Sequence, residues 1–364
     1  MNPLLQGVRV LDLSRLLPGP FCSLYLAQMG ATVIKIEEPN GGDYGRSLMP
    51  ELHELINAGK HSVTLDLRRA EDGAAFRRLA READVVLESF RPGVMERLGC
   101  GYQTLRAENP RLVYAALTGY GQSGPYRDWA GHDMNYNAFA GVLDQTGPAG
   151  GAPVLSNFQI ADLAGGALTC AVALLGALYG ARASGQGCFV DSAMLDGTAA
   201  LQVLSVAGLR ATGRSGRRGE DVLTGALPNY SLYECADGGW IALGALEPKF
   251  FQKFCTAVGR PELLRLPMAP GPAGAGLREA LTALFKTRTR DDWAQAFAGA
   301  DCCLAPVLSP AEMLEDPQLR ARGMIGERHG KPALRSPLRF GPDPLPDLAP
   351  APALGQHNEQ WLGR

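Results

Sequence analysis

The residues best suited to acid–base chemistry stand at the starts of two predicted helices. His132 and Asp133 lie in the segment AGHDMNY, and Asp162 lies further on in IADLAGG. A histidine at a helix start meets the positive end of the helix dipole, which favours neutral imidazole, a proton acceptor. A carboxylate held by backbone amides stays ionised. Two such groups on opposite sides of one carbon could remove a proton from one face and return one to the other.

Helix capping is the simpler role for either aspartate. An aspartate at a helix start accepts a hydrogen bond from a free amide of the first turn, and this alone accounts for one of the two. Capping accounts less well for His132, the imidazole beside Asp133. From the spacing alone, capping remains the favoured interpretation.

The elements that must position these residues alternate between strands and helices. VRVLDL (8–13), the helix FCSLYLAQMG and TVIKIE form a βαβ unit, whose strands should be parallel. Further strands separated by helical segments are predicted at 61–67, 84–90, 111–120 and 187–195. A long helix over 162–183 precedes the last strand, and Gly185 can end it. The alternation predicts an α/β fold with a Rossmann-like, doubly wound parallel sheet.

The composition of the chain changes after the last predicted strand. The basic, glycine-rich stretch 209–224 is typical of a linker between a large domain (1–208) and a smaller α+β domain (225–324). YSLYECADGGWIALGAL predicts a hairpin, and helical patterns follow at 248–258 and 276–299. The proline-rich tail, 325–364, is expected to return to the large domain or to wrap around a partner subunit.

Composition narrows the class of protein. The net charge of −2 does not indicate a protein surface that binds nucleic acid, or a basic one that binds a membrane. The residues before the first strand do not have the pattern of a secretory signal. The apolar segment 163–180 contains four glycines and is typical of a closely packed interior helix, so no membrane partner is expected. The eight cysteines form no CxxC pair, which indicates reduced thiols and a cytoplasmic location. The sequence contains no cluster of His and Cys residues of the kind that binds a metal ion, so no metal site is expected.

GYGQSG (119–124) matches the GxGxxG pattern of dinucleotide sites and follows a strand. In such a site the third glycine opens an amphipathic helix on which the pyrophosphate rests. Here PYRDWAGHD follows, without an apolar period. We therefore interpret the motif as a glycine-rich turn, with NAD binding as the weaker alternative.

Several motifs in the same order resemble one family over nearly the whole chain, the family III CoA-transferase (CaiB/BaiF) and α-methylacyl-CoA racemase superfamily. They are GVRVLDLSRLLPGPFCSLYLAQMGATVIKIEEP, LESFRPGVMERLG, GYGQSGPY, IADLAGG, GQGCFVDSAMLDGTAAL and PALGQHN. The resemblance implies a Rossmann-like large domain built from both ends of the chain, with a small domain between them. It also implies an interlocked homodimer with active sites between the large domain of one subunit and the small domain of the other.

Within this superfamily, GHDMNY is similar to the racemases' GHDINY motif, which implies His132 and Asp162 as the two acid/base groups. GALEPKFF resembles their segment containing a glutamate that pairs with the histidine, here Glu247. Formyl-CoA transferases instead carry a glutamine after the first strand, where this chain has Leu17, and a glycine run in the small domain. Transferases use the aspartate as a nucleophile, so Asp162 does not separate the two activities.

The family also implies that basic residues hold the phosphates of coenzyme A. Arg91 is the best match, followed by Lys60 and Arg97, although an ordinary solvated charge is an equal alternative for the last two. Where members often have an arginine after the second strand, this chain has Glu38. The expected enzyme is a racemase that acts on 2-methylacyl-CoA thioesters and needs no catalytic cofactor, with coenzyme A as part of the substrate. The alternative is a CoA-transferase that moves CoA from an acyl-CoA to a carboxylic acid by way of a mixed anhydride on the aspartate.

Overall fold

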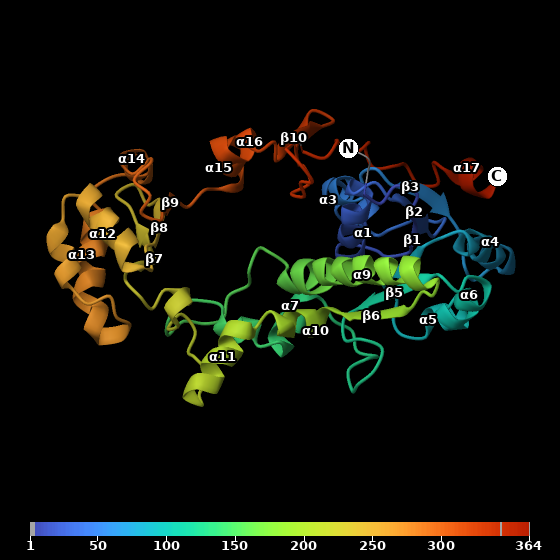
Figure 1. Cartoon of the computed structure of the whole chain (residues 1–364), viewed down its shortest axis with the longest axis horizontal. Coiled ribbons are helices and arrows are strands. Elements are labelled where there is room, and N and C mark those ends of the chain that lie inside the picture. The colour runs from blue at the N-terminus through green and yellow to red at the C-terminus, as the bar shows by residue number, and fades with distance from the viewer. Residues whose placement is uncertain (1–3, 343, 364) are drawn as a thin grey trace. The chain divides into compact units, whose positions relative to one another are not determined.

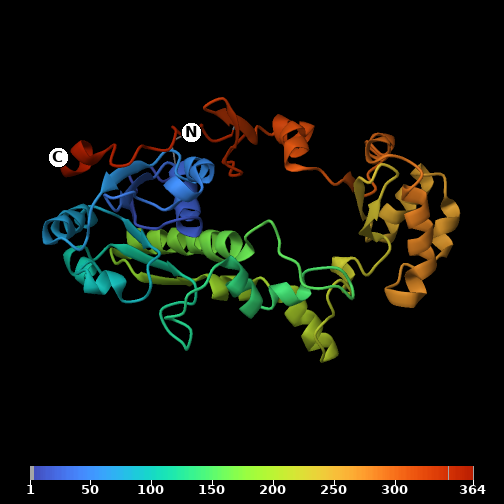
Figure 2. The same cartoon turned by 180° about the vertical axis from the view of Figure 1, so that it is seen from behind.

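The computed structural model describes residues 4–342 and 344–363. The chain divides into two compact units (Figures 1 and 2). Unit 1 contains residues 1–142, 156–202 and 317–364, and unit 2 contains 143–155 and 203–316. These bounds differ from those predicted, because helix α11 (Val203–Thr212) runs into the predicted linker and belongs to unit 2.

Unit 1 is built on a six-stranded sheet in the order β3-β2-β1-β4-β5-β6, and every neighbouring pair is parallel. The strands are β1 (Arg9–Asp12), β2 (Thr32–Glu37), β3 (His61–Thr64), β4 (Val85–Glu88), β5 (Val113–Thr118) and β6 (Phe189–Ala193). The expected parallel sheet is confirmed. Its central strands are short apolar runs because helices cover both faces and leave no strand face to water.

Alternate residues of each strand enter two different cores. Val10, Val33 and Leu87 pack on the side of α1 and α9, whereas Leu11, Ile34 and Val86 pack on the side of α4, α5 and α6. The helices of unit 1 are α1 (Pro18–Gln28), α2 (Gly45–Leu48), α3 (Pro50–Ile56), α4 (Ala70–Arg81), α5 (Val94–Arg97), α6 (Tyr102–Glu108), α7 (Asp133–Phe139), the π-helix η1 (Ala161–Leu168), α9 (Thr169–Ser184), α10 (Met194–Ala200), α16 (Pro317–Ala321) and α17 (Asn358–Leu362). Helix α8 (Val142–Gln145) lies at the boundary with unit 2.

The predicted long helix spans η1 and α9 and ends at Gly185, whose φ is 73°. One face packs on β5 and β6, while Val172 and Tyr179 on another are 71% and 80% exposed. The helix is therefore interior on one side only. The helix Ala161–Ser184 is long and apolar enough to cross a membrane, and 44% of its most apolar 18-residue stretch is buried inside the protein.

The end of the chain returns to unit 1 and covers the edge strand β3. His357 accepts a hydrogen bond from the Ser62 amide through Nδ1 at 3.1 Å, and Asn358 accepts one from the Thr64 amide at 2.9 Å. A short antiparallel hairpin, β10 (Ile325–Arg328) and β11 (Lys331–Leu334), precedes this segment. These contacts protect the open edge of the sheet from other strands.

Unit 2 is an α+β unit with its own core. The antiparallel sheet β7-β8-β9 comprises Tyr230–Glu234, Trp240–Gly244 and Leu304–Pro306, and its first two strands form the predicted hairpin. Phe251, Phe285 and Trp293 fill the core against this sheet. The remaining elements are η2 (Val222–Thr224), α12 (Pro248–Ala257), η3 (Pro261–Arg265), η4 (Gly271–Gly274), α13 (Ala275–Phe285), α14 (Arg290–Ala296) and α15 (Pro310–Glu315).

Candidate active site

Asp133 joins the starts of two helices. It is the first residue of α7, but its Oδ1 accepts hydrogen bonds from the amides of Ala161 at 2.8 Å and Asp162 at 3.1 Å, both in the first turn of η1. Its Oδ2 accepts a bond from Nδ2 of Asn137 at 2.7 Å. Asp133 is therefore a cap, as the simpler interpretation expected, but it caps the other helix.

Asp162 is not a cap. Its carboxylate accepts no hydrogen bond from any residue in the described part of the chain, although the side chain is half-buried. Burial, together with the negative charge of Asp133, raises the pKa of Asp162 to about 7. A carboxyl group with this pKa can donate or accept a proton near neutral pH, which suits acid–base catalysis.

His132 immediately precedes α7 as its N-cap and is exposed. Its backbone N–H donates to Oδ1 of Asn135 at 3.0 Å, which fixes the direction in which the chain enters the helix. Since α7 contacts η1 within unit 1, the structure brings the starts of the two predicted helices together. The imidazole of His132 is thus available to a ligand at this place.

The glycine-rich turn makes room for Tyr136. This side chain is 5% exposed, and its hydroxyl donates to the Gly131 carbonyl at 2.7 Å. A Cβ at Gly119 or at Gly131 would overlap its ring. No helix of the described chain follows Gly124 before α7. The GxGxxG match is therefore a turn that packs a buried tyrosine, and the NAD alternative lacks its helix.

The π-helix η1 carries Asp162 in its first turn. A π-helix is rare and is frequently found at functional sites. Gly165 and Gly166 let η1 lie against α10, because a Cβ at Gly197 of α10 would overlap the carbonyl oxygen of Gly165. The glycines of IADLAGG thus fix the helix that presents Asp162.

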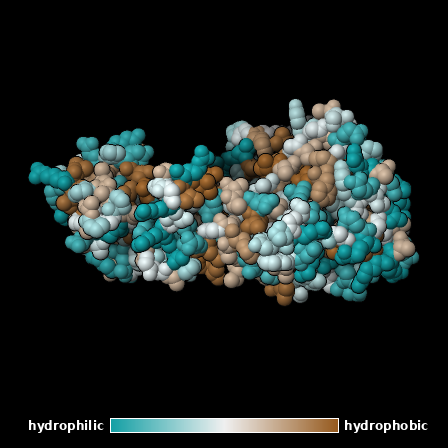
Figure 3. Space-filling model, turned by 90° about the horizontal axis from the view of Figure 1, so that it is seen from below, coloured by the Kyte–Doolittle hydropathy of each residue, from teal (hydrophilic) through white to brown (hydrophobic). Residues whose placement is uncertain are grey.

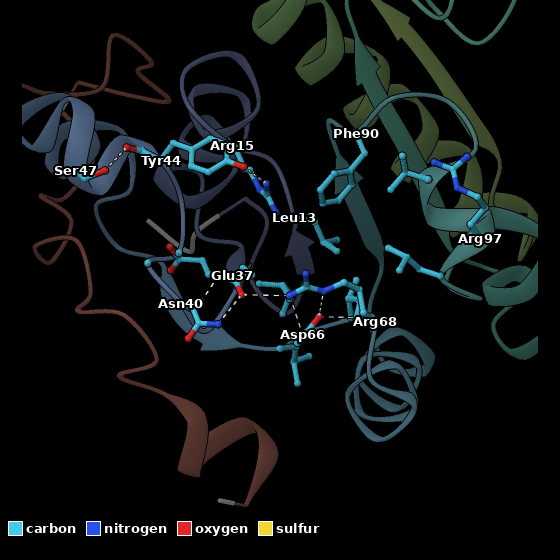
Figure 4. A pocket seen from close by; sticks show the side chains of 18 residues that line it. Leu13, Arg15, Glu37, Asn40, Tyr44, Ser47, Asp66, Arg68, Phe90 and Arg97 are labelled. Carbon is cyan, nitrogen blue, oxygen red and sulfur yellow. Dashed lines mark hydrogen bonds and ion pairs between the residues drawn. The ribbon is translucent and has the colours of Figure 1, made fainter.

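A cleft of 660 Å³ lies at the carboxyl ends of β1 to β4 (Figure 4). Ligands of doubly wound folds bind at this edge, near the point where the strand order reverses, here between β1 and β4. Arg15, Arg68 and Arg97 line the cleft. Arg91, the best sequence candidate for a phosphate contact, is exposed beside Phe90, which also lines it.

Two of these arginines were not predicted. Arg68, which is 70% exposed, pairs with Asp66 at 2.7 Å and with Glu38 at 3.5 Å, so a cation does lie beside Glu38. The guanidinium of Arg15 lies 5.2 Å from the ring centre of Tyr44 and 5.1 Å from that of Phe90. The rule that strand-end loops line the ligand site could have found both residues.

Lys60 lies in the core, away from any phosphate. It is 3% exposed, and its Nζ donates to Asp12 at 3.2 Å, to the Pro20 carbonyl at 2.9 Å and to Asn57 at 2.9 Å. Burial lowers the pKa of Lys60 to about 8, against the opposing charge of Asp12. All three donors are used, so Lys60 has none left for coenzyme A.

Lys35 does not replace the missing arginine either. It is fully buried and pairs with Asp43 at 2.8 Å, and its Nζ also donates to the Ser14 carbonyl. Asp43 in turn accepts a bond from the amide of Leu16, whose φ is 63°. These buried charges hold the loop after β1 in a conformation that a leucine rarely adopts.

Glu247 belongs to unit 2, where it is the exposed N-cap of α12. Its pairing with a histidine therefore remains a prediction.

Within the described residues, no group of three or more His, Cys, Asp or Glu side chains could hold a metal ion. All eight cysteines are free, and six are buried.

The family model of CoA-transferase family III matches residues 5–358. The chain belongs to this family. It is 36% identical to the alpha-methylacyl-CoA racemase of Homo sapiens over 363 residues, covering 98% of this chain and 92% of the racemase. It is 32% identical to the succinate–glutarate CoA-transferase of Agrobacterium fabrum, covering 99% and 95%.

The fold is also that of the family. A CaiB/BaiF family protein from Brucella suis is similar, with a TM-score of 0.87, 32% identity and coverage of 99% of this chain and 98% of that one. Family III therefore supplies two chemistries for the same fold, racemisation and CoA transfer. The family is enzymatic, and the residues around Asp162 bear on which of the two reactions this chain supports.

Proposed function

We propose that this protein interconverts the (R) and (S) forms of a 2-methylacyl-CoA thioester by proton transfer at the α-carbon. The observation that carries the proposal is the Asp162 carboxyl group, which accepts no hydrogen bond from the described chain and has a pKa raised to about 7. It lies at a helix start next to the start that carries His132. A group that must hold a proton in one direction and accept it in the other needs such a pKa.

In the proposed reaction, His132 removes the α-proton of one enantiomer and leaves an enolate. Asp162, in its protonated form, then delivers a proton to the opposite face of the same carbon. In the reverse direction the two residues exchange roles, so no atom or electron is gained or lost. Glu247 of a partner subunit would orient the imidazole and balance its charge.

The enolate oxygen needs hydrogen-bond donors. The first amides of a helix have no intrahelical partner and can bind an anion, but in η1 those of Ala161 and Asp162 already donate to Oδ1 of Asp133. Donors already in position when the charge develops stabilise it by about 3 kcal/mol each. In this proposal the enolate oxygen therefore needs donors other than the first two amides of η1.

The nucleotide half of coenzyme A would occupy the cleft at the strand ends. Arg15, Arg68 and Arg97 line it, and Arg91 is exposed beside it. Guanidinium groups bind phosphate with two parallel hydrogen bonds. We therefore retain Arg91 and Arg97 as proposed phosphate contacts, add Arg68, and assign Lys60 to the core.

CoA transfer remains the second candidate because an unbonded Asp162 carboxylate could also attack a thioester carbon. Relatives of similar identity are transferases. Attack would release the CoA thiolate, leave a mixed anhydride on Asp162 and require a second carboxylic acid to receive CoA.

Incubation of one pure enantiomer of a 2-methylacyl-CoA in D2O separates the two functions. Without any added acid, a racemase incorporates α-deuterium and loses enantiomeric purity. A transferase leaves the α-carbon intact and moves CoA only when an acceptor acid such as succinate is added. Absence of exchange together with acceptor-dependent transfer would overturn the racemase proposal.

A further inference from the structure

The structure places a second carboxylate, Asp133, where it acts on Asp162 through the backbone. It stands at the first position of α7, where an acidic side chain commonly meets the amides of its own helix. Instead its Oδ1 reaches the amides of Ala161 and Asp162 at 2.8 and 3.1 Å. Its Oδ2 is taken by Asn137, one turn along α7, at 2.7 Å. Both oxygens are thus bonded inside the protein, so Asp133 does not act on the substrate.

We propose that Asp133 is a positioning residue, which locks the two helix starts together through its hydrogen bonds and acts by its charge on the carboxyl group of Asp162. The inference rests on the proposed proton-transfer function and extends it to a residue outside the reacting set. It follows from two separate features of Asp133, its hydrogen bonds and its charge.

The hydrogen bonds fix geometry. A 1,1-proton transfer needs its two groups on opposite faces of one carbon, and small displacements are costly in rate. Asp133 follows His132 directly in the chain and bonds the backbone amide of Asp162 itself. One side chain therefore sets the separation of the two reacting residues, and Asn137 prevents it from rotating away.

The charge of Asp133 adds to the effect of burial on the protonation of Asp162. Burial is the first cause of the raised pKa of Asp162, and the charge of Asp133 is the second. The same two carboxylates also raise the pKa of Tyr136, after burial, which keeps its hydroxyl protonated. Neighbouring carboxylates in different surroundings divide into one that stays charged and one that carries the proton.

The test removes the charge and keeps the shape. Asp133→Asn retains an acceptor oxygen for the two amides, and Asp133→Ser is a second neutral variant in case the first does not fold. Asp196→Asn is the matched control, because it removes an exposed acid from the first turn of α10, a helix that packs on η1. Dependence of kcat/KM on pH is measured for each enantiomer of a 2-methylacyl-CoA, and the carboxyl titration of Asp162 is followed by ¹³C NMR in free enzyme.

The expected result is that the titration of Asp162 moves to lower pH by about 1 unit in the Asp133 variants. The pH limb of the enantiomer that uses Asp162 as base moves by the same amount, and Asp196→Asn moves neither. An unmoved titration with a reduced rate would overturn the proposal and leave Asp133 a structural cap. The NMR titration needs no turnover, so failure of the racemase proposal would appear separately, as absence of exchange in the wild-type protein.

Discussion

Burial has opposite consequences for two charged residues of unit 1. Asp162 has a pKa raised to about 7 by burial and a neighbouring like charge, and it is left without a hydrogen-bond donor from the described chain. Lys60 is also buried, but the carboxylate of Asp12 faces it. The pKa of Asp12 would rise on burial, yet Lys60, Lys35 and two serine hydroxyls bring it down to about 2. Asp162 has no opposite charge beside it and is suited to proton transfer, whereas the paired charges of Lys60 and Asp12 stabilise the fold.

Lys60→Met should therefore act on stability and leave coenzyme A binding unchanged. Removing one partner of a buried ion pair leaves the other charge desolvated, so we expect a loss of about 3 kcal/mol in the free energy of unfolding. Urea unfolding at about pH 7.5, below the unfolded pKa of lysine, measures it. The double variant Asp12→Asn/Lys60→Met is the control and should lose less than the two single variants together. A stable Lys60→Met with a raised KM for the CoA thioester would restore Lys60 as a phosphate contact.

At the scale of elements, the close approach of η1 and α10 sets the position of Asp162. Gly197 lies against the backbone of Gly165 with no space for a side chain, whereas a methyl carbon at Gly176 of α9 would meet nothing within 4 Å. The two glycines occupy helices of the same unit but meet different surroundings. They therefore form a matched pair for measuring what the helix contact contributes.

Gly197→Ala should lower the free energy of unfolding by about 2 kcal/mol or more, since overpacking forces the helices apart. Gly176→Ala should raise it by about 0.5–1 kcal/mol, because alanine is the better helix former. Thermal melts of both variants beside the wild type measure the difference. Equal effects of the two substitutions would contradict the close contact seen here.

The strands and helices of unit 1 followed from local sequence, whereas parts of the site did not. Short apolar runs between amphipathic segments predicted the parallel sheet, because a sheet covered on both faces needs them. The hydrogen bond from the amide of Asp162 to Oδ1 of Asp133 joins two segments that are far apart in the sequence, so the spacing of residues could not predict it. Burial of Lys60 was equally hidden, since lysine is almost never buried unless paired. The catalytic roles of His132, Asp162 and Glu247 were implied by resemblance to the family's motifs. From local spacing alone, helix capping was the favoured role for the aspartates.

At the scale of the whole molecule, the return of the chain end depends on two neutral imidazoles. The rings of His61 and His357 stack with centres 4.3 Å apart, and Trp361 donates to Nδ1 of His61 at 2.8 Å. Burial lowers the pKa of both histidines, and for His61 the neighbouring His357 lowers it further. The guanidinium of Arg9 over Trp361 adds another positive charge nearby.

Acidification should therefore release the chain end. A histidine whose folded pKa lies below its unfolded value contributes stability above about pH 6.5, and that stability is lost as the pH falls. We expect the melting temperature to fall and the Trp361 fluorescence to change between about pH 7 and 5. His61→Phe/His357→Phe should reduce this dependence, and His53, whose pKa burial lowers to about 4, should account for the part that remains. An unchanged pH profile in the double variant would rule out the histidine pair as its cause.

Several large hydrophobic side chains are exposed, among them Val203, Leu204, Met134 and Phe139, as a surface covered in the proposed interlocked dimer would be. Hydrophobic patches are visible on the face of the molecule drawn in Figure 3. If Glu247 serves the His132 of a partner, chains carrying His132→Ala and Glu247→Gln should complement each other. A mixed dimer then contains one site with both defects and one intact site. Co-refolding equal amounts should restore about a quarter of wild-type activity from two inactive variants. No recovery in verified mixed dimers would place both residues in the same subunit's site.

The most direct measurement of the central claim is solvent deuterium exchange by the single variants His132→Ala and Asp162→Ala, each with both pure enantiomers of a 2-methylacyl-CoA. Two groups on opposite faces predict a crossed pattern. Each variant should exchange the α-proton of only one enantiomer, the opposite one in each case, and neither should racemise its substrate. Loss of exchange with one enantiomer in both variants, or retained racemisation in either, would contradict the assignment of His132 and Asp162 as the two proton carriers.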